Sequence, residues 1–163
     1  MDLSFDIRNS QGDHIMVALS YYDCETVEIF TNDRAVLTLV FYDVTLIKKS
    51  GTGYVNYRLL SAVSDVLAKF MGENEDAVLC FYCDADTDVL RNHFEISPQE
   101  YRSRLFSRMF DMYVKSHTAP KFINHRVEIE DPRGRVYRQY AHFICREGHE
   151  KAVEVLGRKL MQK

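Results

Sequence analysis

A glycine-rich basic stretch is the part of the sequence best suited to bind an anionic ligand. It reads Lys48-Lys49-Ser50-Gly51-Thr52-Gly53, and a helix is predicted after it. Such a turn can aim backbone N–H groups at a pyrophosphate, helped by the positive end of the helix dipole. The stretch lacks the Gly-Lys-Ser/Thr of a P-loop. A flexible loop without a ligand is the alternative interpretation.

Three aspartates, Asp84, Asp86 and Asp88, follow the most apolar stretch of the chain. Their spacing is that of a calcium loop, but the glycine and the closing glutamate of that motif are absent. A solvated acidic loop is therefore favoured. Asp84 directly follows a predicted buried strand, and ligands often lie at the carboxyl ends of such strands. We therefore keep Asp84 as a candidate site residue.

Cysteine and histidine spacing supports neither a metal centre nor a hydrolase. Cys80 and Cys83 form a C-x-x-C, but residues three apart in a strand point to opposite faces and cannot share a metal. The six histidines form no H-x-x-x-H motif, and G-x-S-x-G is absent. We expect buried thiols and no metal site.

Arginines recur along one predicted helix, at Arg102, Arg104 and Arg108. Arg104 and Arg108 share a face, and Glu100 can pair with Arg104. One interpretation is a solvated, salt-bridged face, on which replacing Arg104 by Ala would cost under about 1 kcal/mol. The other is contact with a ligand phosphate or a partner.

The elements that must position these residues surround one apolar strand, Ala77–Cys83, which has no polar interruption and is expected to be buried on both faces. A long amphipathic helix, Ser97–Lys115, follows a charged loop and begins with a capping box. We expect the core to centre on Val78, Cys80, Leu105 and Met109. Replacing Leu105 by Ala would then cost roughly 2–5 kcal/mol.

The remaining elements predict a single α+β domain spanning residues 1–163. Two helices separated by one strand predict a parallel crossover within a mostly antiparallel sheet of about six to seven strands. The other predicted strands are Leu3–Ile7, His14–Tyr21, Glu25–Thr31, Arg34–Tyr42, Lys121–Ile129 and Arg135–Cys145, the last two joined by a turn at Asp131-Pro132-Arg133-Gly134, and the other helices are Asn56–Met71 and Gly148–Met161.

Composition disfavours two classes of partner. The net charge of −3 and the pI near 6.1 argue against bulk attraction to nucleic acid or to an anionic membrane. No stretch is as long and apolar as a transmembrane helix, and the first residues do not form a signal peptide. The cytoplasm is the expected compartment.

Two resemblances add to these expectations. Val78–Asp84 and Arg102–Phe110 resemble a family of small bacterial proteins of unknown function, in which a strand ending in Cys-Asp precedes an Arg- and Phe-rich helix. The element order resembles the GNAT N-acyltransferase fold without its first two helices. In that family a loop of the form Gln/Arg-x-x-Gly-x-Gly/Ala binds the coenzyme A pyrophosphate. Lys48, Gly51 and Gly53 match this loop, with Lys in the first position.

The GNAT resemblance also implies catalytic roles. The family often carries Leu-Tyr-x-Lys on its later helix, and Met112–Lys115 matches this segment. Tyr113 would then protonate the leaving thiolate, and Asp84 would act as a base or orient a water molecule. The expected function is that of a GNAT-like domain that binds an acyl-CoA-type ligand, either as an N-acyltransferase or as a degenerate relative that still binds coenzyme A. The alternative is a non-enzymatic protein-interaction module that forms a homodimer, which the many aromatics and the amphipathic helix fit equally well.

Overall fold

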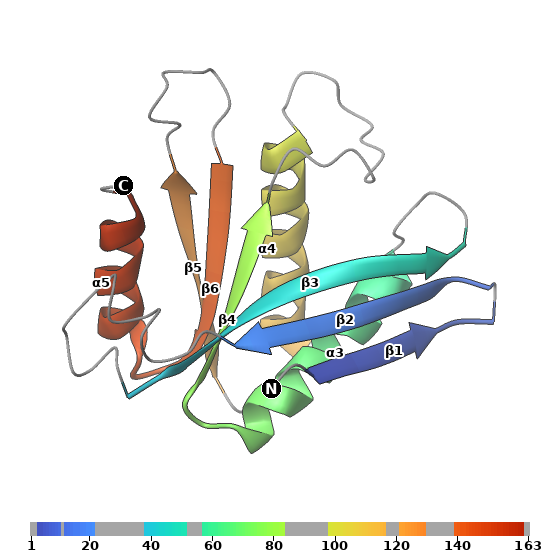
Figure 1. Ribbon diagram of the computed structural model, residues 1–163, viewed down its shortest axis with the longest axis horizontal. Helices are drawn as coiled ribbons and strands as arrows, with labels where there is room; N and C mark the ends of the chain where they lie inside the picture. The colour runs from blue at the N-terminus through green and yellow to red at the C-terminus, as the bar shows by residue number, and fades with distance from the viewer. Residues whose placement is uncertain are drawn as a thin grey trace.

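The computed structural model describes residues 3–10, 12–21, 38–51, 57–83, 98–116, 121–129 and 139–161. In these residues one six-stranded sheet runs in the order β1-β2-β3-β4-β6-β5 (Figure 1). The elements in chain order are β1 (Leu3–Arg8), β2 (His14–Tyr21), β3 (Val40–Ser50), α3 (Tyr57–Glu73), β4 (Ala77–Cys83), α4 (Pro98–Ser116), β5 (Phe122–Ile129), β6 (Gln139–Arg146) and α5 (Glu150–Met161). The predicted α+β fold with three helices is confirmed.

The predicted parallel crossover is also confirmed. β3 and β4 form a parallel pair, and every other neighbouring pair of described strands is antiparallel. The parallel pair is short, because it runs only from Val40 opposite Ala77 to Asp43 opposite Cys80. Beyond these positions β3 continues beside β2 as far as Ser50, and β4 continues beside β6. The two strands therefore diverge in the middle of the sheet (Figure 1).

Two hydrophobic clusters lie on opposite faces of this sheet. The first cluster contains residues of all six strands and of α3, and side chains of α4 such as Phe106 pack against it. The second is covered by α5, whose Val153 and Leu156 pack with Phe41 and Phe143 of the sheet. Because strand residues alternate between faces, β4 contributes to both clusters and is buried on both sides, as predicted.

The expected centre of the core is wrong in its details. Helix α4 lies on the face of Leu79 and Phe81, where the Phe106 ring centroid is 4.2 Å from that of Phe81. Val78 and Cys80 point to the opposite face, toward the α5 cluster, so they do not meet the α4 stripe. Every residue of this strand is apolar, so its sequence does not show which alternate residues face α4 and which face α5.

The same correction applies to α4 itself. Met109 is buried, as expected, but Leu105 is only half-buried. The predicted cost of Leu105→Ala is therefore too high.

The largest difference in element bounds concerns β3. The sequence predicts a strand at Arg34–Tyr42, whereas β3 begins at Val40 and runs to Ser50. The predicted strand Glu25–Thr31 and the turn at 131–134 lie outside the described residues. No helix in the described part of the chain is long and apolar enough to span a membrane.

Candidate functional site

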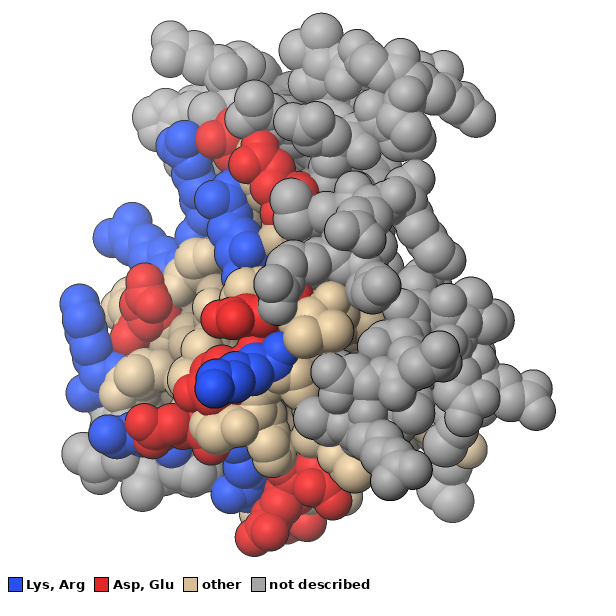
Figure 2. All heavy atoms as spheres, turned by 90° about the vertical axis from the view of Figure 1, so that its left-hand side faces the viewer, with Lys and Arg blue, Asp and Glu red and all other residues tan. Residues whose placement is uncertain are grey.

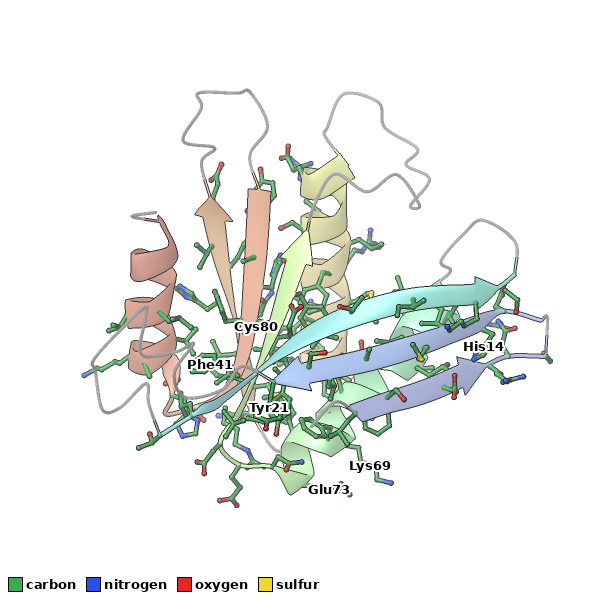
Figure 3. The ribbon with its side chains drawn as sticks, in the orientation of Figure 1. His14, Tyr21, Phe41, Lys69, Glu73 and Cys80 are labelled. Carbon is green, nitrogen blue, oxygen red and sulfur yellow. The ribbon has the colours of Figure 1, made fainter. Side chains whose placement is uncertain are left out.

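The point where β3 and β4 separate carries a carboxylate. Asp43 occupies the last paired position of β3, opposite Cys80. Because Phe41 belongs to the α5-side cluster, Asp43, two residues along the strand, faces the same side. Figure 3 labels Phe41 and Cys80, which lie on neighbouring strands close to this point. Asp43 is half-buried, and burial raises the pKa of its carboxyl group.

Cys80 is not a nucleophile in this arrangement. Burial raises the pKa of its thiol, and the negative charge of the neighbouring Asp43 raises it further. The thiol is therefore protonated at neutral pH, and a protonated thiol is a poor nucleophile. The site offers one acid–base group, Asp43, next to an inert thiol.

Asp43 was not predicted as a site residue from the sequence, although a signal for it was present. The run Val40-Phe41-Tyr42-Asp43 ends β3's apolar segment in an aspartate, just as Cys80–Asp84 does for β4. The reasoning that selected Asp84 as the residue at the end of a buried strand applies equally to Asp43. Asp84 itself lies outside the described residues.

The structure corrects the interpretation of the glycine-rich stretch. Lys48 belongs to strand β3, where its backbone is paired with Ile15, and not to a loop. Gly53 lies outside the described residues, as does the side chain of Lys48. These residues are therefore not seen together as a pyrophosphate loop.

Gly51 has a structural reason to be glycine. Its φ is +126°, and a Cβ atom there would collide with the Asp13 carboxylate. Asp13 is buried, and Asn9 holds it with two hydrogen bonds: Nδ2 donates to Asp13 Oδ2 at 2.8 Å, and Asn9 Oδ1 accepts from the Asp13 N–H at 2.9 Å. Gly51 thus lets the end of β3 pack against the β1–β2 turn.

Tyr113 lies in a different part of the molecule from Asp43. It lines an apolar hollow that is partly open to solvent, with Leu67 of α3 and Leu79 and Ile144 of the sheet. This hollow is on the α4 face of the sheet, opposite the face of Asp43. Burial, followed by the nearby charge of Asp65, raises the pKa of the Tyr113 phenol.

The course of α4 also separates Tyr113 from the end of β4. Ser103 of α4 contacts Arg126 and Ser107 contacts Asn124, so α4 runs antiparallel to β5. β5 and β4 are both antiparallel to β6, so α4 also runs antiparallel to β4 (Figure 1). Tyr113 is therefore near the beginning of β4, while Asp84 directly follows its end.

A buried polar cluster under α4 was not foreseen from the sequence. Ser103 Oγ is 2.8 Å from His142 Nε2, and His142 Nδ1 is 2.9 Å from Asn124 Oδ1. Arg126 Nε donates to Ser103 Oγ at 2.7 Å. The residues come from α4, β5 and β6, so no local spacing in the sequence could have linked them.

This cluster has the order of a nucleophile, a base and an orienting amide, but it lacks access. Ser103 and His142 each have 0% exposure, so no substrate carbonyl can reach the serine oxygen. Burial, together with the charge of Arg126, lowers the pKa of His142 to about 4. The imidazole is therefore neutral at physiological pH.

Charged side chains elsewhere on the described surface fit a solvated role. Arg104 is exposed and donates to Glu100 Oε1 at 2.7 Å, one helical turn away, as the solvated-face interpretation predicts. On the α5 side, acidic and basic side chains are interspersed (Figure 2). The described residues contain no group of three or more His, Cys, Asp or Glu that could hold a metal ion.

Comparison of the chain with protein-family models, with curated proteins and with solved structures finds no match.

Proposed function

We propose that this protein is a GNAT-like domain that binds an acyl-CoA-type ligand where β3 and β4 separate, and that Asp43 is its acid–base residue. The observation that carries the proposal is the divergence of the parallel pair directly after Asp43 and Cys80. Parallel strands that separate in this way leave a site at their carboxyl ends, which is where ligands of α/β sheets commonly bind.

The inner edges of the two strands supply the binding chemistry. After Asp43, β3 is paired only with β2, and after Cys80, β4 is paired only with β6 among the described strands. Each strand therefore presents backbone N–H and C=O groups toward the other without a strand partner there. An extended chain that carries amides, such as the pantetheine arm of coenzyme A, can add to such an edge by β-type hydrogen bonds.

The acid–base requirement of N-acyl transfer favours Asp43. The attacking amine must lose a proton, and a general base works best when its pKa lies close to the working pH. Burial moves the pKa of Asp43 upward in that direction. Tyr113 lies on the other face of the sheet, so the proposal rests on Asp43 and leaves the general-acid role of Tyr113 a prediction.

Thermal unfolding with and without acetyl-CoA tests this function. A ligand at 100 times its dissociation constant stabilises the folded state by about 2.7 kcal/mol, which gives a clear rise in melting temperature. We expect Lys48→Ala, which removes a positive charge from the half of β3 that diverges from β4, to reduce this rise. Lys69→Ala, at an exposed position on α3, should leave it unchanged. The absence of any rise for the wild-type protein with millimolar acetyl-CoA would overturn the proposal.

Gly51→Ala is not a useful probe of the same site. The positive φ and the close approach of Asp13 make any side chain at Gly51 unfavourable whether or not a ligand binds there. A loss of function in that variant would report strain at the strand end.

A further inference from the structure

The buried polar cluster under α4 includes one residue at the surface. Ser103 is hydrogen-bonded to His142, which is in turn hydrogen-bonded to Asn124. Ser103 also accepts a hydrogen bond from Arg126. Ser103 and His142 are fully buried, whereas Arg126 is exposed. The cluster therefore connects the interior of the domain to one guanidinium group at its surface.

We propose that this cluster positions Arg126 as a recognition residue for a small oxyanion, a carboxylate or a phosphate group held by the outer edge of the guanidinium. The inference does not depend on the acyl-CoA proposal, since Arg126 lies on β5 and two strands, β6 and β4, separate it from β3.

The hydrogen-bond directions in the cluster are fully determined. Asn124 Oδ1 can only accept, so the neutral imidazole carries its proton on Nδ1 and donates it to this oxygen. Nε2 then accepts a hydrogen bond from the Ser103 hydroxyl, and Ser103 Oγ accepts one from Arg126 Nε–H. Each of these polar atoms has a partner, as a buried network requires in order to be rigid.

The guanidinium of Arg126 is held in two ways. Its Nε is bound to Ser103, and its central carbon lies 4.3 Å from the centre of the Tyr140 ring. The hydrogen bond and the stacking contact together fix the plane of the group. The two terminal nitrogens remain for a ligand, because in the described part of the chain no carboxylate pairs with Arg126.

This arrangement suits a bidentate oxyanion. A guanidinium presents two parallel N–H groups that match the two oxygens of a carboxylate or a phosphate. Because the side chain is already ordered, binding loses less conformational entropy than binding to a free surface arginine. Arg104 offers the contrast within the same domain, since Glu100 already occupies its terminal nitrogen.

Nearby charge limits the expected affinity. Glu128 lies two residues along β5 and faces the same side of the sheet. Its carboxylate opposes a second anion near Arg126, so we expect a dissociation constant on the order of millimolar.

The test is an NMR titration of the arginine Nε–H signals of the intact protein. Sodium phosphate and sodium acetate are added separately at constant ionic strength, with sodium chloride as the reference salt. We expect the Arg126 Nε–H signal to be protected from exchange and to shift saturably with one or both oxyanions. The arm that saturates at lower concentration distinguishes phosphate from carboxylate recognition.

Two variants separate positioning from charge. Ser103→Ala keeps Arg126 but frees its Nε, so the protection should disappear and the response should fall several-fold. In the wild type the backbone amide of Tyr140, whose ring lies against the guanidinium, should shift with the same oxyanion. Arg126→Lys keeps the charge at an exposed position, and this shift should be lost.

Three results would overturn the proposal. One is an Arg126 signal that shifts no more with phosphate or acetate than with chloride, or no more than the Arg104 signal does. Another is a full response in a folded Ser103→Ala protein. The third is an unchanged Tyr140 response in Arg126→Lys.

Discussion

Asp43 lies where its charge is unfavourable to the fold. Burial raises the pKa of its carboxyl group, which means that the folded protein binds the proton more tightly than the unfolded chain does. The contribution of the neutral carboxyl group to stability is complete below the unfolded pKa and is lost as the pH rises through the folded pKa. At neutral pH the charged form therefore lowers the stability of the folded state. Such unfavourable charges are common among residues of functional sites.

Asp43→Asn should accordingly leave the melting temperature at pH 7 unchanged or raise it. The amide has nearly the same shape and no charge to desolvate. In the same variant, any acyl transfer from acetyl-CoA to an amine should fall by about 10²-fold or more, in the usual range for loss of a general base. A lower melting temperature with unchanged transfer would mean that Asp43 is a structural residue.

His142 gives a pH dependence of the opposite kind. Its pKa falls from 6.5 to about 4 on folding, so the folded state resists a proton that the unfolded chain accepts. The stability due to neutral His142 is complete above about pH 6.5 and declines as the pH falls toward 4. The decline amounts to at most about 3 kcal/mol, at 1.36 kcal/mol per pKa unit.

Urea unfolding of the wild type and of His142→Gln at pH 7 and pH 5 measures this contribution. The wild type should lose more free energy of unfolding between the two pH values than the variant does. Because Asp43 titrates in both proteins, the difference between them isolates the histidine. Equal losses would contradict the neutral, buried state of His142.

Contacts between side chains could be predicted only where the two residues are close in the sequence. Arg104 and Glu100 are one helical turn apart, and their ion pair could be anticipated from the spacing alone. Ser103 and His142 are 39 positions apart, and only the packing of α4 on β6 brings them together. The positions of most helices and strands could be predicted from the sequence in the same way, from local patterns. The buried cluster could not be predicted, because its residues come from three separate elements.

At the scale of elements, the composition of β3 explains why its second half was not predicted as a strand. Its second half, Asp43 to Ser50, mixes charged and apolar residues, and several of these side chains are exposed. β4 no longer pairs with β3 along this half. No strand was predicted there, because its polar and apolar residues do not alternate throughout as they do in a strand with one solvated face.

The phase of α4 gives a prediction with a matched control on one helix. Met109→Ala should cost about 2–4 kcal/mol, because Met109 is buried beside Leu79 and its loss enlarges an existing hollow. Leu105→Ala should cost roughly 1 kcal/mol, since half of that side chain is already exposed. Urea unfolding measures the free energy of unfolding of both variants. A larger loss for Leu105→Ala than for Met109→Ala would contradict this packing.

At the scale of the whole molecule, one sheet carries two clusters and a break in its middle. β4 joins the clusters, because its alternate residues point into each. The same strand forms one side of the divergence from β3, so the candidate site is held by a strand that packs into both clusters. A site on such a strand is more rigid than one on a loop. The sequence predicted the parallel pair but not where it would end, because that depends on the twist of the strands.

The most direct test of the acyl-CoA proposal is an amide ¹H–¹⁵N NMR titration of the intact protein with acetyl-CoA. The account predicts that the largest shifts fall on the two inner edges, residues 43–50 of β3 and 80–83 of β4, and that β1 and α5 change little. Shifts confined to β1, α5 or the outer strand β5, or no shifts at millimolar ligand, would contradict it.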